Sequence, residues 1–553
     1  MTAPNPAIVT QRAAQRLPRI PLLLLCAAYV LPGLFGRDPW KNADVGAFGA
    51  MLDLAHGRSA WLSPTIAGVP ADAAPLPHWL GAGFIALLSP LADAAFAARV
   101  PFALLLVLTL VLVWYTTYHL ARTEAAQPIA FAFGGEADAI DYARAMADGA
   151  VLALIATLGL LQLGHETTPE LAQLASVALL LWSLASAPYR GWRSRLAALL
   201  ALPLLTASGA PTMAVAMGAL GVLICMRSAY DGARSLALWL GLGTLLAVLL
   251  ASVGDLWAWR LDTDQDSGQA FLTARLLLWF AWPAWLLALW TLWRWRRQVI
   301  NRHISVPLAT ALVGVLACIA MGGSERALML GLPGLAVLAA FALPTMQRSV
   351  TSAIDWFSVF FFTICAIAIW VVYAAMHSGF PASTAANVAR LAPEFAPRFS
   401  WPALLFALLG TAAWAWLVRW RTGRHRQALW KSLVLPASGV ALNWLLLMSL
   451  WLPLLDHARS YRPLVERIAR HVPRDACVAA PGMARAPLAA LEYFGGWQVD
   501  GRAGAAERSD CRYLLLQGHR NAPPAAPSGW RLVTREQRPT DRDETMSVFR
   551  RQR

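Results

Sequence analysis

Repeated apolar runs constrain this chain more than any other feature of its sequence. Runs of about 17–25 mostly apolar residues, long enough to cross a hydrocarbon core of ~30 Å, recur up to Leu455. Of the 553 residues, 58% are hydrophobic and only 14% are charged, whereas about a quarter of the residues of a soluble domain are charged. The sequence therefore predicts an all-α polytopic membrane protein.

We expect about 13 transmembrane helices. The long run 196–225 is interrupted at Ser208-Gly209-Ala210-Pro211, which predicts two segments, since glycine and proline break a helix. The short run 75–92 does not fit a simple alternation of the spans, and we expect it to be re-entrant or interfacial. The predicted segments are 17–35, 75–92, 98–119, 148–164, 170–187, 196–225, 235–252, 273–293, 305–321, 327–345, 353–375, 401–418 and 432–454.

The net charge of +15 follows the pattern of a membrane protein. Arginines gather in the short loops 190–195, 294–302 and 419–431, as the positive-inside rule predicts for cytoplasmic loops. They do not form a patch suited to a nucleic-acid groove, so no nucleic-acid partner is expected. With these loops in the cytoplasm, the residues after Leu455 lie on the opposite, external face.

The composition changes at about residue 456. We therefore expect a transmembrane domain over residues 1–455 and a small external α/β domain over 456–553. Cys477 and Cys511 lie in this tail, and an oxidising compartment would allow them to form one disulfide. The predicted elements of the tail are helices at 462–471 and 486–493, and strands at 476–480, 513–516, 530–534 and 546–549.

A charged cluster, Arg37-Asp38-Pro39-Trp40-Lys41-Asn42-Ala43-Asp44, follows the first apolar segment. Charge at a membrane edge is costly and marks a candidate functional site. The cluster opens the loop 36–74, which contains a predicted helix over 45–56 whose apolar stripe suits the membrane interface. A structural interpretation of Asp44 is also open, because aspartate is a good N-cap for that helix.

Several motifs in order resemble the bacterial aminoarabinose transferase and protein O-mannosyltransferase superfamily of GT-C membrane glycosyltransferases. The resemblance is strongest over residues 30–120. The motifs are the acidic loop after the first span, Trp61-Leu62-Ser63-Pro64, Gly68-Val69-Pro70, the acid Asp72, Pro75-Leu76-Pro77-His78-Trp79, Ala97-Ala98-Arg99-Val100-Pro101 and Glu325-Arg326-Ala327-Leu328-Met329-Leu330-Gly331-Leu332-Pro333.

The resemblance implies roles for individual residues. The family's Asp-Glu-x-x-Tyr pattern falls on residues 44–48, so Asp44 takes the place of the catalytic acid and Phe48 that of the tyrosine. The second family acid falls on Asp72, but Ala73 stands where the family has a lysine near the donor phosphate. Arg37, Lys41 or His78 would then have to supply the missing positive charge.

The function implied by the resemblance is inverting transfer of a sugar from a polyprenyl-phosphate donor to an acceptor hydroxyl of a lipid, glycan or protein. It also implies a bacterial inner-membrane protein with a periplasmic C-terminal domain, in contact with membrane lipids. A transporter or flippase of lipid-linked glycans is the alternative. The expected catalytic residues are Asp44 and Asp72; the expected phosphate ligands are Arg37, Lys41, Arg99 and Arg326; and the expected acceptor or sugar ligands are Asp38, His78, His165 and Glu166.

No spacing of cysteines and histidines predicts a metal site. Asp262, Asp264 and Asp266 alternate in a loop and are compatible with a divalent cation. They lack the glycine and the distant glutamate of a calcium loop. A solvated acidic loop is therefore the favoured interpretation, and no cofactor is firmly predicted.

Overall fold

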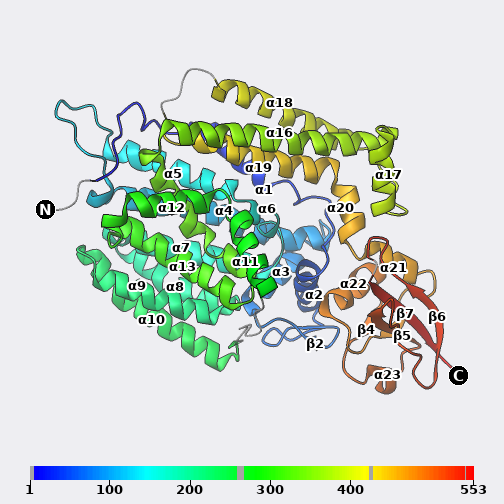
Figure 1. Cartoon of the computed structure of the whole chain (residues 1–553). Helices are drawn as coiled ribbons and strands as arrows, with labels where there is room; N and C mark the ends of the chain where they lie inside the picture. The colour runs from blue at the N-terminus through cyan, green and yellow to red at the C-terminus, as the bar shows by residue number, and fades with distance from the viewer. Residues whose placement is uncertain (1–4, 258–266, 423–427, 542, 553) are drawn as a thin grey trace.

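The computed structural model describes residues 5–257, 267–422, 428–541 and 543–552. Figure 1 shows a large helical bundle and, at the C-terminal end, a small domain with a sheet. The helices are α1 (Arg19–Val30), α2 (Ala43–Ala55), α3 (Pro75–Leu88), α4 (Ala94–Ala121), α5 (Ala139–Ala156), α6 (Leu158–Leu163), α7 (Pro169–Arg190), α8 (Trp192–Ala207), α9 (Pro211–Met226), α10 (Asp231–Val253), α11 (Ser267–Phe280), α12 (Ala284–Arg294), α13 (Arg302–Ala320), α14 (Glu325–Met329), α15 (Leu332–Ala342), α16 (Arg348–Ser378), α17 (Ala382–Leu391), α18 (Trp401–Thr422), α19 (Lys431–Leu450), α20 (Leu452–Arg459), α21 (Arg462–Ile468), α22 (Arg485–Gly495) and α23 (Ala505–Arg508).

The bundle is that of a multi-pass membrane protein. Within the described ranges, 7 helices are long and apolar enough to cross a membrane, or 8 if α11 and α12, bent by 87°, form one span. The 7 are α4, α7, α10, α13, α16, α18 and α19. Each predicted apolar segment coincides with a helix or a pair of helices, but several are short, so the number of about 13 crossings stays a prediction.

Proline and glycine end the helices where the sequence predicts it. The run 196–225 is divided into α8 and α9: Gly209 has a φ of 89°, which favours glycine, and Pro211 begins α9. Helix α3 has 14 residues, about 21 Å at the usual rise and therefore shorter than a hydrocarbon core. This length favours the re-entrant or interfacial interpretation of the segment 75–92.

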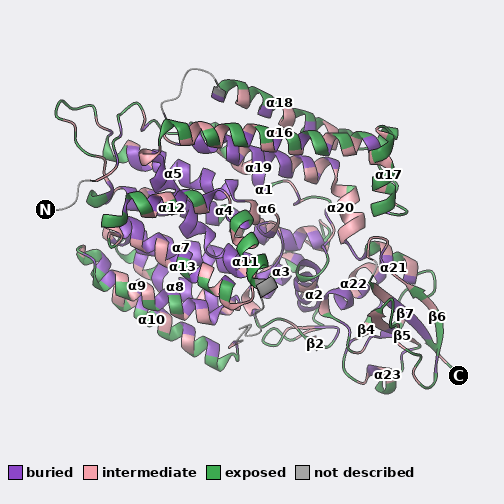
Figure 2. Ribbon diagram, viewed as in Figure 1, coloured by how far each residue is buried: buried purple, intermediate pink, exposed green. Residues whose placement is uncertain are grey.

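Burial separates inner helices from outer ones (Figure 2). In its most apolar window α7 is 83% buried and α19 is 78% buried, whereas α16 is 22% and α18 only 11% buried. Apolar residues therefore cover the outside of the bundle at α16 and α18. A continuous apolar surface of this kind is suited to lipid and not to water.

The C-terminal domain contains a five-stranded sheet with the order β4-β3-β5-β7-β6. β3 pairs in parallel with β4 and β5, and β7 pairs antiparallel with β5 and β6. The six predicted elements of the tail are all present, and Cys477 is bonded to Cys511; β4 and α23 were not predicted. The strands are β3 (Cys477–Ala479), β4 (Gln498–Asp500), β5 (Tyr513–His519), β6 (Trp530–Glu536) and β7 (Glu544–Arg551).

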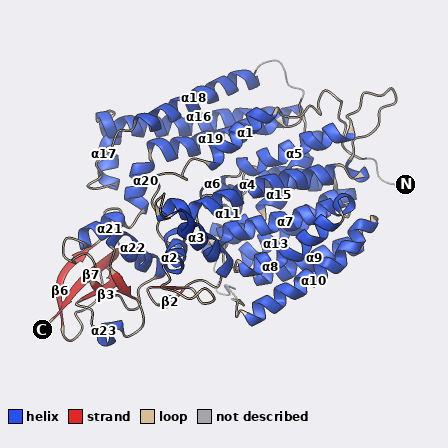
Figure 3. Ribbon diagram, turned by 180° about the vertical axis from the view of Figure 1, so that it is seen from behind, coloured by secondary structure: helices blue, strands red, loops and turns tan. Residues whose placement is uncertain are grey.

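The first loop and the C-terminal domain share one hydrophobic core. Val45 and Ala50 of α2 pack in the same cluster as Leu488 and Ala489 of α22, and Figure 3 shows α2 between the bundle and the sheet domain. A short hairpin of β1 (Thr65–Ile66) and β2 (Val69–Pro70) lies in the same loop. The expectation of an interfacial α2 is wrong, because most of the helix is buried in protein.

The predicted boundary at residue 455 falls inside α20, which runs from Leu452 to Arg459. This short helix follows the last long helix of the bundle, α19, and leads into α21 of the C-terminal domain. It therefore carries its polar residues, Asp456 and Arg459 among them, to the region where the bundle, α2 and the sheet domain meet.

Candidate active site

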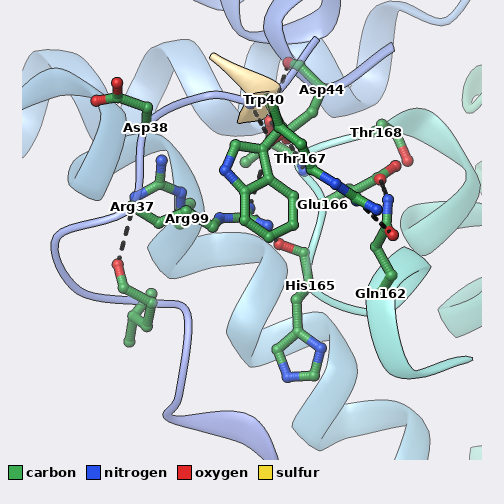
Figure 4. A network of polar contacts seen from close by, with 12 residues as sticks. Arg37, Asp38, Trp40, Asp44, Arg99, Gln162, His165, Glu166, Thr167 and Thr168 are labelled. Carbon is green, nitrogen blue, oxygen red and sulfur yellow. Dashed lines mark hydrogen bonds and ion pairs between the residues drawn. The ribbon is translucent and has the colours of Figure 1, made fainter. Parts of the chain in front are cut away.

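Asp44 is held near the start of α2 by Arg37 and Trp40, which precede it closely in the sequence, and by Thr167, 123 positions away (Figure 4). Its Oδ1 accepts hydrogen bonds from the backbone N–H and the hydroxyl of Thr167, both at 2.8 Å. Its Oδ2 accepts one from the Trp40 backbone N–H at 3.1 Å and lies 3.4 Å from Nη2 of Arg37. The N-cap interpretation is therefore wrong: Asn42 occupies the cap position, and the Asp44 carboxylate turns away from the N–H groups of its own helix.

Asp44 is ionised at neutral pH although it is buried. Burial raises the pKa of its carboxyl, but the positive charges of Arg37 and Arg99 and the N–H groups of Thr167 and Trp40 lower it more, so the net shift is downward. Hydrogen bonds and opposite charges of this kind favour the charged form of an acid. The site therefore presents a fixed carboxylate to whatever approaches it.

Two buried guanidinium groups flank this carboxylate. The Arg37 side chain has no exposed surface, and its Nη2 donates to the His165 carbonyl oxygen at 2.7 Å. Arg99, on α4, is 4% exposed, with Nη1 3.5 Å from the Leu34 carbonyl oxygen. Among the described residues, Nε and Nη1 of Arg37 and Nη2 of Arg99 have no hydrogen-bond partner. Buried donors without partners are costly, and guanidinium donors suit a phosphate.

A second acid, Glu166, lies beside Asp44 with the opposite pKa shift. Its Oε1 accepts a hydrogen bond from Gln162 at 2.9 Å, and its Oε2 one from Arg326 at 2.7 Å. Burial, and next the negative charge of Asp44, raise the pKa of Glu166. Environments that push two neighbouring carboxyl groups apart in pKa are typical of acid–base sites.

Asp456 and Arg459 complete the cluster and were not predicted. Asp456 Oδ1 accepts from Trp40 Nε1 at 2.8 Å and from the Asp38 N–H at 3.3 Å. Burial raises the pKa of Asp456 to about 7. The Cζ atom of Arg459 lies 5.0 Å from the centre of the Trp40 ring. The sequence did contain one indication of these two residues. They follow the last apolar segment directly, just as the charged cluster 37–44 follows the first apolar segment.

Two predicted phosphate ligands are placed differently from Arg37 and Arg99. Arg326 donates to Glu166 and, at 3.0 Å, to Glu170 and Thr168, so carboxylates already balance its charge. The Lys41 side chain is exposed at the edge of the cluster. Neither residue presents an unused buried donor as Arg37 and Arg99 do.

The side chains of two predicted acceptor ligands, Asp38 and His165, are engaged in contacts within the protein. Asp38 forms a two-bond ion pair with Arg462 of α21, at 2.6 and 2.9 Å. The ring nitrogens of His165 lie 2.7 and 2.8 Å from the carbonyl oxygens of Leu161 and Tyr29, and Figure 4 shows the ring pointing away from Asp44. His165 therefore contributes its backbone carbonyl to the site, through Arg37, while its ring packs into the bundle.

Asp72 and His78 line another cavity, of about 430 Å³, between α2 and the C-terminal domain. Asp72 forms an ion pair with Arg485 of α22, and neither Asp44 nor Arg37 belongs to the lining. Ala43, Gly46 and Ala47 of α2 face this cavity, and at ~100° per residue Asp44 points to a different side of the helix. Asp72, which was expected to act together with Asp44, therefore lies at a different cavity.

A mostly apolar cavity of about 360 Å³ lies between α9 and α13. Its polar end is formed by Arg326 and Glu170, which are ion-paired, and Arg326 also pairs with Glu166, the acid whose pKa is raised by burial and by the negative charge of Asp44. An apolar groove that ends at charged side chains is suited to a lipid with a polar head. Its apolar lining includes Met213, Ala216, Val313, Leu316, Ala317, Met321 and Leu330.

Comparison with known proteins reveals a match in structure. No family model and no curated protein matches the sequence. The crystal structure of ArnT from Cupriavidus metallidurans bound to undecaprenyl phosphate matches at a TM-score of 0.61 and 14% sequence identity, covering 96% of this chain and 97% of that one. Its apo structure matches at a TM-score of 0.62 and 13% identity, with the same coverage. The chain has the ArnT fold.

The ArnT fold covers both the bundle and the C-terminal domain, which agrees with the GT-C architecture expected from the sequence motifs. Within the described residues, no group of three or more histidine, cysteine, aspartate or glutamate side chains is arranged to hold a metal ion. Asp262, Asp264 and Asp266, for which the sequence favours a solvated acidic loop over a cation site, lie outside the described residues.

Proposed function

We propose that this protein is an inverting glycosyltransferase that moves a sugar from a polyprenyl-phosphate donor to an acceptor hydroxyl. One observation carries the proposal: the buried guanidinium groups of Arg37 and Arg99 keep N–H donors without partners next to the fixed carboxylate of Asp44. The ArnT structure bound to undecaprenyl phosphate, which shares the fold, supports a donor of the same class.

In the proposed reaction the acceptor oxygen attacks the anomeric carbon of the sugar. A bond forms between them while the bond from that carbon to the phosphate oxygen breaks, and the phosphate leaves with the electron pair. Arg37 and Arg99 stabilise the negative charge that the polyprenyl phosphate acquires. Because one displacement occurs from the face opposite the leaving group, the anomeric configuration is inverted.

The acceptor hydroxyl must lose its proton as it attacks, and a carboxylate is suited to take it. We assign this general-base role to Asp44, which is ionised and held rigidly by Thr167 and Trp40. Glu166 lies close enough to orient the acceptor, and its raised pKa would make it the stronger base. Substituting the two acids separately decides between them.

Arg37 is our proposed replacement for the family lysine that is missing at Ala73. It is buried beside Asp44, whereas Lys41 is exposed and His78 lines the other cavity. The apolar groove that ends at Arg326 and Glu170 is the proposed path of the polyprenyl chain. The proposed location is the bacterial inner membrane, with the reaction at its periplasmic face and a lipid, glycan or protein as acceptor.

The test uses the purified full chain in proteoliposomes containing radiolabelled undecaprenyl-phosphate sugar and an extract of envelope acceptors. Label transferred to an acceptor, with release of undecaprenyl phosphate, supports the proposal. Movement of the labelled lipid between leaflets without any transferred label would instead establish the transporter or flippase alternative. The Asp44→Asn and Glu166→Gln variants measured in parallel assign the base.

A further inference from the structure

A groove of about 360 Å³ lies between α1, α4 and α5, away from the candidate active site. Arg99 is in the first turns of α4, whereas Leu110 and Tyr115 line the groove. Tyr115 is therefore about 24 Å from Arg99 along the helix axis. Figure 3 shows α1 and α5 on the side of the N-terminus, and the sheet domain at the other end of the molecule.

The walls of the groove are apolar and open outward. Beside it, α1 presents further apolar side chains: Ile20 is 72% exposed and Leu24 is 65% exposed. Surface of this kind is stable against hydrocarbon and not against water. The apolar residues that line the groove are Leu17, Leu22, Leu23, Leu110, Val111 and Val151.

The mouth of the groove is basic. It is formed by Arg16, Arg19 and Arg144. Arg144 lies 3.5 Å from Asp141 and is partly neutralised by it. Arg16 and Arg19 are exposed, and no hydrogen bond or ion pair holds either side chain within the part of the chain that the structure describes.

One acid, Asp148, also lines the groove, but its oxygens are occupied. Oδ1 accepts a hydrogen bond from Trp114 Nε1 and Oδ2 one from the Leu17 N–H, both at 2.8 Å. Asp148 is 4% exposed. It anchors the start of α1 and is not presented to solvent at the mouth, where Arg16 and Arg19 dominate the charge.

We propose that this groove binds one anionic phospholipid, with an acyl chain along the apolar wall and the headgroup phosphate on Arg16 and Arg19. Guanidinium groups bind phosphate oxygens in pairs of hydrogen bonds, and basic residues at a membrane surface favour anionic lipids. The site is independent of the proposed transfer reaction, because none of its lining residues belongs to the candidate active site.

Native mass spectrometry of the full chain, titrated with phosphatidylglycerol or phosphatidylcholine in detergent, tests the proposal. We expect one phosphatidylglycerol to bind at least about tenfold more tightly than phosphatidylcholine. The exposed pair Arg16→Gln/Arg19→Gln should weaken phosphatidylglycerol binding about tenfold or more, given two lost charges. The wall variant Val111→Trp, which keeps every charge, should weaken both lipids.

The matched control is Arg193→Gln/Arg195→Gln, which removes two charges from the first turn of α8 and leaves the groove untouched. It should retain the affinity of the unmodified protein for phosphatidylglycerol. Equal losses in both double variants would mean that anionic lipid responds to overall charge and would overturn the site. Unchanged binding in Arg16→Gln/Arg19→Gln would overturn it as well.

Discussion

The carboxylate of Asp44 accepts two hydrogen bonds from Thr167, one from its N–H and one from its hydroxyl, each at 2.8 Å. Asp44 lies in the first turn of α2 and Thr167 just before α7, 123 positions apart in the sequence. This contact connects the first loop to the turn before α7, which also carries Glu166. It therefore brings the two acids of the candidate site together and leaves the Asp44 side chain with little freedom to rotate.

Replacing Asp44 with asparagine is expected to lower sugar transfer by at least about 100-fold, because the general base is lost. The amide keeps the side-chain volume but loses one acceptor oxygen, so folding is checked alongside transfer. Transfer is measured with the radiolabelled donor, and folding by size-exclusion chromatography and the thermal midpoint. Asp500→Asn, at an acid that pairs with Arg502 in the C-terminal domain, is the control. Full transfer by a folded Asp44→Asn protein would exclude Asp44 as the base.

Replacing Arg37 or Arg99 with glutamine is expected to weaken undecaprenyl phosphate binding by about 10- to 100-fold, the usual loss for a hydrogen bond to a charged group. Affinity is measured by microscale thermophoresis in detergent. Arg195→Gln removes a similar charge at a distance and should bind normally. Equal affinity for all three variants would remove both arginines from the phosphate site.

Asp456 should make stability depend on pH. Its folded pKa is raised to about 7 from 3.8, mainly by burial. The folded state therefore binds a proton that the unfolded state has lost, and stability falls as the pH rises from about 4 to about 7. Asp456→Asn removes this pH dependence. Between pH 5 and pH 8 the free energy of unfolding of the unmodified protein should therefore fall by on the order of 2 kcal/mol more than that of the variant. The thermal midpoints of the two proteins, measured over this pH range, report the difference. Parallel pH profiles of the two proteins would contradict the assignment.

Two glycines of α2 should respond differently to alanine. A Cβ on Gly49 would lie 2.3 Å from the Cβ of Ala489, so α2 and α22 would have to separate, whereas on Gly46 the nearest atom would be 3.9 Å away. Gly49→Ala should destabilise the protein by about 1–3 kcal/mol. Gly46→Ala should be neutral or stabilising by up to about 1 kcal/mol, since alanine favours a helix. Thermal midpoints of both variants test the shared core; equal midpoints would contradict it.

The disulfide between Cys477 and Cys511 closes a segment of the tail with a sequence separation of 34 residues. Its removal as Cys477→Ser/Cys511→Ser should destabilise the C-terminal domain by about 3–4 kcal/mol, because the unfolded tail gains freedom. Pulse proteolysis of the full chain, read by loss of a C-terminal tag, measures this. The free cysteine Cys365, replaced with serine, is the control, and no difference between the two proteins would refute the effect.

The helical segments could be predicted because a span requires a long apolar run and its ends are marked by glycine, proline or arginine. Half of the site could also be predicted, since Arg37 and Asp44 are seven positions apart and lie in one charged cluster. The position of α2 could not be predicted from the sequence. Its apolar residues suit lipid and protein equally well, and only the packing of α22 against it shows that it is buried in protein.

The sequence by itself determined that this is a membrane protein with a C-terminal α/β tail, and it placed a charged cluster at the edge of the first span. These features depend on local composition and spacing. The tertiary structure alone decided the membership of the site: it brought Thr167 and Glu166 to Asp44, brought Asp456 to Trp40, and turned Asp72 toward a separate cavity on another side of α2. The reason is physical, because a buried carboxylate needs donors and cations around it, and distant segments of the chain supply them only once the helices have packed.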